Sequence, residues 1–263
     1  MISTHVASPV RRVRVGPGAL DQLPAELAAL GVERPLLACS RTLAAQGGVV
    51  ERIRALAQQP ALPCFTELSQ HTPEASVEAL GRLLRQQDRD GVISLGGGSV
   101  IDGVKVAIHR SGLASRHLAV PTTLSGAEFT PTAGITASAS GNKVGLRVWE
   151  SAPQTVILDP RLCLRTPLRL WLASGVRALD HAVETAWSPE HDPLLGMLAQ
   201  EAAARLWRLL PECRRRPRAL EPRQGLQVAA WWAALGLAGA SMGPSHTLSR
   251  LLGARFGIPH GIT

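Results

Sequence analysis

The chain has 263 residues, a formal net charge of +8 and a hydrophobic fraction of 45%. This apolar content supports a folded core and argues against wholesale disorder, and the length suits one large domain or two modest ones. The basic residues are nearly all scattered arginines and aromatic residues make up only 3% of the chain, so an anionic small molecule explains the charge as well as nucleic acid does, and we expect no nucleic-acid partner.

Strands and helices are expected to alternate over the first 160 residues. Short apolar segments predict strands at 10–15, 35–39, 64–68, 91–95, 117–120 and 155–158, and helical spacing falls at 19–30, 41–58 and 73–87. Such alternation is typical of a parallel sheet covered by helices on both faces. Residues 133–148 are small and polar instead, with a Ser-Gly-Asn centre at 140–142, and predict a β-hairpin.

The pattern becomes entirely helical after Pro167, with helices expected at 169–186, 193–210, 224–237 and 245–254. The sequence therefore predicts an α/β nucleotide-binding domain over residues 1–163 and an all-α domain over residues 164–263. The longest apolar run, 228–242, is shorter than the roughly 20 residues of a membrane span, so we expect no membrane partner.

The four cysteines are far apart in the sequence, and none belongs to a C-x-x-C motif. This spacing argues against a zinc ribbon and against a disulfide scaffold, and it favours reduced thiols in a cytoplasmic protein. The N-terminus, residues 1–14, also has no apolar segment typical of a secretory signal.

The buried strand at 91–95 leads directly into Gly96, Gly97 and Gly98 and then into a helix. Three residues without Cβ let backbone N–H groups approach a phosphate, and a helix N-terminus favours an anion. Ser99 is predicted as the N-cap, with Asp102 three residues later as in a capping box. The stretch is neither the dinucleotide fingerprint nor a Walker loop, so a turn without a ligand remains the alternative.

A second polar segment, Pro121-Thr122-Thr123, follows the next predicted strand. Ligands of parallel α/β sheets bind at the carboxyl ends of the strands. Since both segments occupy such ends, the sequence favours a ligand over an empty turn.

In the helical half, Arg177, His181 and Glu184 share one face of a predicted helix, and two further histidines follow at His246 and His260. Three imidazoles from three segments could bind one metal ion, since imidazole suits zinc, iron and nickel. Taken singly, each histidine is more often a structural residue, and the spacing alone does not decide between these readings.

These motifs resemble, in their order along the chain, those of the iron-containing alcohol dehydrogenase family with its dehydroquinate-synthase-like fold, and especially its maleylacetate reductase branch. The segments that carry the resemblance are Gly96–Ser99 with Asp102, Pro121–Pro131, Asp159-Pro160, Ser174–Glu184 and Pro259–Gly261. The resemblance implies hydride transfer between NAD(P)H and a small carbonyl, alcohol or enone substrate, in a cytoplasmic enzyme.

The resemblance also implies which residues contact the cofactor. The matching positions are Gly96, Gly97, Gly98, Ser99 and Asp102 with Thr122, Thr123 and Ser125. Ser40, next to Arg41, stands after the second strand, where an acidic residue would bind the ribose 2′-hydroxyl of NAD. Because that acid is absent, both NAD and NADP are expected candidates.

Three features depart from the family pattern. His181, His246 and His260 match the metal-binding histidines, but Arg177 occupies the place of the family's aspartate ligand, and a guanidinium cannot ligate a cation. Asp180 points about 100° away around the helix, so it is expected to pair with Arg177 instead. Arg250 replaces a further histidine, and the family's additional helices would follow Thr263, so the helical domain is expected to be shortened.

Three hypotheses follow. In a metal-independent reductase, Arg177, with Arg250, binds a substrate carboxylate or stabilises an enolate, and His246 or His181 donates a proton. In a metal-dependent enzyme, the three histidines hold Fe²⁺ or Zn²⁺, which polarises the carbonyl. The third hypothesis is a catalytically impaired nucleotide-binding paralogue.

A homodimer is also expected, because a shortened helical domain would expose apolar surface.

Overall fold

The computed structural model describes residues 8–112, 116–138, 143–188 and 193–237, together with Gly243, Ser245, Leu248 and Leu252. The chain divides into two compact units. The α/β unit consists of Pro9–Thr122 and Pro131–Leu162. The helical unit contains Thr123–Thr130 and the described residues from Cys163 onward.

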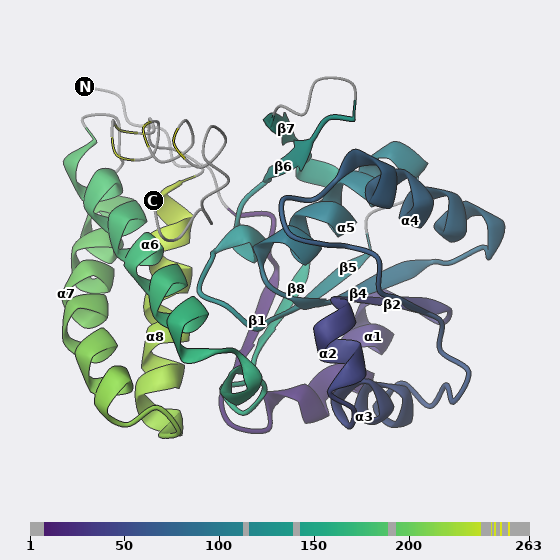
Figure 1. Ribbon diagram of the computed structural model, residues 1–263, viewed down its shortest axis with the longest axis horizontal. Coiled ribbons are helices and arrows are strands. Elements are labelled where there is room, and N and C mark those ends of the chain that lie inside the picture. The colour runs from purple at the N-terminus through teal and green to yellow at the C-terminus, as the bar shows by residue number, and fades with distance from the viewer. Residues whose placement is uncertain are drawn as a thin grey trace. The chain divides into compact units, whose positions relative to one another are not determined.

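The α/β unit contains a six-stranded sheet in the order β1-β8-β5-β4-β2-β3 (Figure 1). All of its neighbouring strands are parallel, which confirms the predicted sheet type. Inner strands of such a sheet are covered on both faces, so they are continuous apolar runs rather than alternating ones. The strands are β1 (Arg12–Val15), β2 (Pro35–Cys39), β3 (Cys64–Phe65), β4 (Gly91–Gly96), β5 (His117–Pro121) and β8 (Thr155–Leu158).

Helices cover the sheet on both faces, and each face has its own apolar core (Figure 1). One core includes Val77 and Leu80 of α4 (Glu74–Gln86) with Val104 of α5 (Gly98–Ser111), and the other includes Leu27 of α1 (Leu23–Leu30) with Ile53 of α3 (Val49–Leu56).

The helix predicted over 41–58 is interrupted. It forms α2 (Arg41–Ala45) and α3 (Val49–Leu56), because Gly47 and Gly48 adopt φ angles of 63° and 76°. A left-handed glycine ends an α-helix at low steric cost.

The predicted hairpin is confirmed as an antiparallel pair of β6 (Thr132–Thr136) and β7 (Lys143–Arg147), with Gly134 opposite Gly145. Its expected centre at 140–142 lies outside the described residues.

Three long helices form the helical unit: α6 (Leu168–Trp187), α7 (Pro193–Arg215) and α8 (Leu220–Gly236). Their shared core combines Trp171 and Leu206 with many alanines, which let the helices approach closely. Gly175 of α6 serves the same purpose, because a Cβ there would collide with Leu210 of α7. Helix α7 continues through Pro211, beyond its predicted end. None of the described helices is long and apolar enough to cross a membrane.

Thr123–Thr130 joins the helical unit although it lies within the stretch 1–163 that the sequence assigns to the nucleotide-binding domain. The Leu124 side chain belongs to the core of the helical unit, and its N–H donates to Ser174 Oγ on α6 at 3.0 Å. A Cβ on Gly126 would lie 2.7 Å from Ala234 Cβ, so only glycine lets this segment contact α8 so closely.

Candidate active site

The glycine segment forms an abrupt junction between β4 and α5. Gly96 ends β4 with φ +157°, and a Cβ there would lie 2.9 Å from Val100 Cγ2. The N–H groups of Val100 and Ile101 both donate to the Gly97 carbonyl, whereas those of Gly98 and Ser99 precede the first intrahelical bond. Two open donors at the positive end of a 14-residue helix fit a phosphate.

The predicted capping box at this junction is wrong. Gly97 is the N-cap, in an extended conformation, and Ser99 is the second residue of α5. Side-chain capping by Ser99 would require it to precede the helix, but the helix starts two residues earlier than predicted, directly after the extended Gly97. The Ser99 carbonyl instead accepts a hydrogen bond from Thr72 Oγ1 at 3.1 Å.

Asp102 links α5 to the β-hairpin. Its Oδ2 accepts from the Gly134 N–H at 3.1 Å, and its Oδ1 lies 2.9 Å from Lys105 Nζ. Lys105 is fully buried and also donates to the Thr132 carbonyl. Lys105 is not among the site residues predicted from the sequence, although a lysine among apolar helix positions, three residues after an aspartate, is a signal for such an ion pair. A cofactor contact by Asp102 stays a prediction.

The carboxyl ends of β5, β4 and β2 lie side by side in the sheet. Register pairs Gly96 with Pro121 and Leu95 with Cys39, so Thr122, the glycine segment and Ser40 follow neighbouring strands. The Thr122 N–H donates to the Gly96 carbonyl at 2.9 Å. Ser40 caps α2, because its Oγ accepts from the Leu43 N–H at 3.3 Å. The α/β unit therefore gathers these predicted contacts at one edge of its sheet.

Thr123 and Ser125 belong to the helical unit. Among the described residues, Thr123 Oγ1 is buried with no hydrogen-bond partner. A buried hydroxyl of this kind fits a ligand that supplies an acceptor. The Ser125 Oγ accepts weakly from the Ala127 N–H at 3.4 Å. The open donors before α5 and the buried Thr123 hydroxyl both fit a phosphate-bearing cofactor.

Arg177 and His181 occupy successive turns of α6 and share one face. His181 is only 4% exposed. Burial lowers the pKa of the Arg177 guanidinium, while the charges of Asp180 and Glu184 oppose that shift. The Arg177–Asp180 ion pair stays a prediction, and Asp180 Oδ1 accepts a hydrogen bond from Ser245 Oγ at 2.6 Å.

Of the three predicted metal ligands, the structure describes His181. Within the described ranges, no three histidine, cysteine, aspartate or glutamate side chains are grouped so that they could hold a metal ion. His181 has the Arg177 guanidinium one turn away, and a guanidinium repels a cation. The other predicted site residues of this half, His246, His260 and Arg250, lie outside the described residues.

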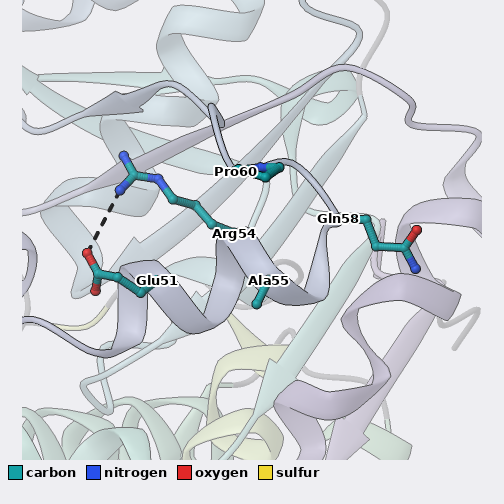
Figure 2. A pocket seen from close by; sticks show the side chains of 5 residues that line it. All are labelled: Glu51, Arg54, Ala55, Gln58 and Pro60. Carbon is teal, nitrogen blue, oxygen red and sulfur yellow. Dashed lines mark ion pairs between the residues drawn. The ribbon is translucent and has the colours of Figure 1, made fainter.

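A shallow pocket of about 460 Å³ lies beside α3, and no predicted site residue lines it (Figure 2). Its walls are Glu51, Arg54, Ala55, Gln58 and Pro60, with Arg54 Nη1 3.8 Å from the Glu51 carboxylate. The cofactor contacts proposed from the sequence therefore do not include this pocket.

Comparisons with known proteins match both halves of the chain. Residues 10–160 match the family described as iron-containing alcohol dehydrogenase, and residues 171–263 match the C-terminal part of the Fe-containing alcohol dehydrogenase family. The chain is 34% identical over 249 residues to maleylacetate reductase 2 of Cupriavidus pinatubonensis, across 95% of this chain and 67% of that protein. It is 34% identical to maleylacetate reductase of Pseudomonas knackmussii, across 96% and 70% of the two chains.

Solved structures agree. Maleylacetate reductase from Agrobacterium tumefaciens superposes with a TM-score of 0.88 at 28% identity, covering 99% of this chain and 72% of that one. Sulfoacetaldehyde reductase from Bifidobacterium kashiwanohense, in complex with NAD⁺, gives a TM-score of 0.91 at 26% identity, covering 99% and 73%. These findings confirm the resemblance, the fold class and an oxidoreductase that uses an NAD-type cofactor. The chain belongs to the iron-containing alcohol dehydrogenase family, in its maleylacetate reductase-like branch.

Proposed function

We propose that this enzyme reduces a small carbonyl or enone compound that carries a carboxylate, and that it does so without a bound metal ion. The observation that carries the proposal is Arg177, a guanidinium on α6 one turn before the buried His181. Such a cation disfavours a metal and favours an anion. Support also comes from the relatives that are named maleylacetate reductases, since maleylacetate carries carboxylates.

In this mechanism the bound nicotinamide supplies the hydride. Arg177 stays protonated even with a lowered pKa, because an arginine side chain does not lose its proton in proteins. Its paired N–H groups bind the substrate carboxylate bidentately or stabilise the oxygen of a developing enolate. His181 or His246 then donates the proton that the reduced substrate requires.

We propose that the cofactor phosphates bind the open N–H groups of Gly98 and Ser99 and the hydroxyls of Thr122 and Thr123. The buried Thr123 hydroxyl and the two donors that precede the first bond of α5 support this assignment. Hydroxyl and backbone N–H groups are the usual neutral partners of phosphate oxygens.

We further propose that NAD is preferred over NADP, and that Glu67 supplies the acid that is absent after β2. Ser40 and Glu67 form an isolated antiparallel bridge, and directly opposed residues carry their side chains on one face, with Cβ atoms about 5 Å apart. Glu67 is exposed, so its carboxylate can accept from the ribose 2′-hydroxyl and would repel a 2′-phosphate. Replacing Glu67 with alanine should lower the ratio of NADH affinity to NADPH affinity by about tenfold.

The decisive experiment compares Arg177→Gln with Arg177→Lys on two substrates, maleylacetate and a neutral aldehyde, using NADH oxidation. Arg177→Gln should lower kcat/KM for the carboxylate substrate by about 100-fold, because a charge-assisted bidentate contact is lost, and Arg177→Lys should recover part of it. NADH affinity should stay unchanged in both variants. Metal analysis of the active enzyme runs in parallel, and stoichiometric iron or zinc would contradict the proposal.

The same NADH-oxidation assay tests the alternative of a catalytically impaired nucleotide-binding paralogue. That alternative requires NADH to bind with no substrate oxidising it. A homodimer also stays a prediction, and the mass of the protein in solution tests it.

A further inference from the structure

Two cysteines that are 25 positions apart in the sequence meet at the edge of the parallel sheet. Cys39 is the last residue of β2 and Cys64 is the first residue of β3. Their sulfur atoms are 3.5 Å apart. Leu37 pairs with Cys64 in the register, so Cys39 lies diagonally across from Cys64 on the same face of the sheet.

The two thiols differ in exposure. Cys39 is fully buried, whereas Cys64 is partly exposed. A reagent in solution therefore reaches Cys64 first, and Cys39 is positioned behind it.

The surroundings also favour the thiolate on Cys64. A hydrogen bond from Cys39 and the positive charge of Arg54 lower the pKa of the Cys64 thiol, against the effects of burial and of Glu51. The same hydrogen bond, together with burial, raises the pKa of Cys39. Arg54 is held on this side of the sheet by the hydrogen bond that its Nε donates to the Leu62 carbonyl at 3.4 Å. A nucleophilic thiolate beside a resolving thiol is the arrangement of peroxide-sensitive cysteines.

We propose that Cys39 and Cys64 form a reversible disulfide when the enzyme meets a hydroperoxide, and that this disulfide weakens cofactor binding. In the first step the Cys64 sulfur attacks a peroxide oxygen; the O–O bond breaks, a sulfenic acid forms and the alcohol or water leaves. In the second step the Cys39 sulfur attacks the Cys64 sulfur; the S–S bond forms, the S–O bond breaks and water leaves with the Cys39 proton. Two thiols are oxidised by two electrons in total, and one peroxide is reduced.

The fold allows the sulfur atoms to approach from 3.5 Å to the bonded distance of about 2.05 Å. Strand β3 has only two residues, and β2 is its sole neighbour in the described sheet, so β3 can move with little loss of pairing. Glutathione or a dithiol reverses the reaction by thiol–disulfide exchange.

The link to cofactor binding is Ser40, which directly follows Cys39 and caps α2. The bridge from Ser40 to Glu67 follows both cysteines by a few residues, so a disulfide at 39–64 strains the segment that faces the ribose in the proposed function. This consequence rests on the proposed cofactor site, whereas disulfide formation does not.

The experiment exposes the protein to hydrogen peroxide, counts its free thiols, maps its disulfide-linked peptides and measures its NADH affinity. Of the four cysteines, two should remain as thiols, and one peptide pair should be joined through Cys39 and Cys64. The Kd for NADH should rise by about fivefold or more, a usual scale for coupled sites, and dithiothreitol should restore it. Peptide mapping that finds both thiols reduced, or joined to other partners, overturns the disulfide.

Two variants separate the parts of the proposal. Cys64→Ser should keep its NADH affinity through the same peroxide treatment, whereas Cys163→Ser should respond like the natural protein, because a serine hydroxyl can still accept from Gln227. A disulfide that forms while NADH affinity is unchanged overturns the regulatory effect. If NADH does not bind before oxidation, the proposed function has failed, and thiol counting still decides the disulfide.

Discussion

In the α/β unit the proposed cofactor contacts are mainly backbone groups of the Gly96–Gly98 segment between β4 and α5. In the helical unit, by contrast, the proposed chemistry depends on the identity of one side chain, that of residue 177. The junction works because Gly96 adopts φ +157° with no room for a Cβ, and α5 starts directly after the extended Gly97. On α6 the helix would also form with aspartate at that position, because a single residue change costs little in a 20-residue helix. In the proposed function Arg177 changes the chemistry and not the fold, so the two units must be tested by different kinds of substitution.

The largest effect is expected from Gly98→Asp, at the first residue of α5. A carboxylate there stabilises the helix dipole, so the protein should fold normally, but it repels the cofactor phosphate from the same N–H groups. We expect NADH affinity to fall by about 100-fold or more in a fluorescence titration, because like-charge contacts cost several kcal/mol.

Gly98→Ala is the matched control, since it adds a Cβ without charge and should lose much less affinity. Wild-type NADH affinity in Gly98→Asp, with an unchanged Tm, would show that the junction does not bind phosphate.

Arg177→Asp tests the helical unit by restoring a carboxylate one turn before His181. The variant should gain affinity for zinc or iron, measured by metal analysis after dialysis, and should lose about 100-fold in kcat/KM for a carboxylate substrate. Arg177→Asn, which removes the cation without adding a carboxylate, should lose activity and gain less metal. Equal metal content in the wild type and in Arg177→Asp would contradict the assignment of Arg177 as the residue that excludes metal.

His117 should make the stability of the α/β unit dependent on pH. Its Nε2 lies 2.7 Å from Ser94 Oγ and its Nδ1 lies 3.1 Å from the Ser151 carbonyl, so Nδ1–H donates and Nε2 accepts. Burial, with the Lys105 charge, lowers the pKa of His117 to about 3, although the Ser151 bond opposes the shift.

Below about pH 6.5 the unfolded chain takes up a proton on this histidine that the folded chain does not. The free energy of unfolding should therefore fall by up to about 1.4 kcal/mol per pH unit as the pH decreases from 6.5 toward 3, and should be fully retained above 6.5. Urea unfolding at several pH values, compared with His117→Gln, measures this slope. The same slope in both proteins would assign the acid sensitivity elsewhere.

The smallest effect is expected from Ser174→Ala on α6. Its Oγ accepts from the Leu124 N–H, so the substitution leaves a buried donor without its acceptor and should cost about 1–3 kcal/mol of unfolding free energy. Ser111→Ala, near the C-terminal end of α5, should cost less than about 0.5 kcal/mol. Equal losses in the two variants would show that the 123–130 segment does not depend on Ser174.

Much of the candidate cofactor site could be predicted from the sequence, because it depends on local features. Gly96–Gly98 and Thr122 follow apolar strands, and strand ends in a parallel sheet share an edge. Asp102 could not be assigned in the same way. Its partners are Lys105 on its own helix and Gly134 on the hairpin, and the second of these contacts depends on how distant segments pack.

The parallel sheet, its strands at Pro35–Cys39 and Thr155–Leu158, the hairpin and the three long helices could all be predicted from the sequence. Hydrophobic periodicity and glycine positions encode these elements locally. Two features could not be predicted and follow from tertiary packing: Thr123–Thr130 joins the helical unit, and Cys39 contacts Cys64. Both results depend on contacts between residues far apart in the chain, where spacing along the sequence carries no information about distance in space.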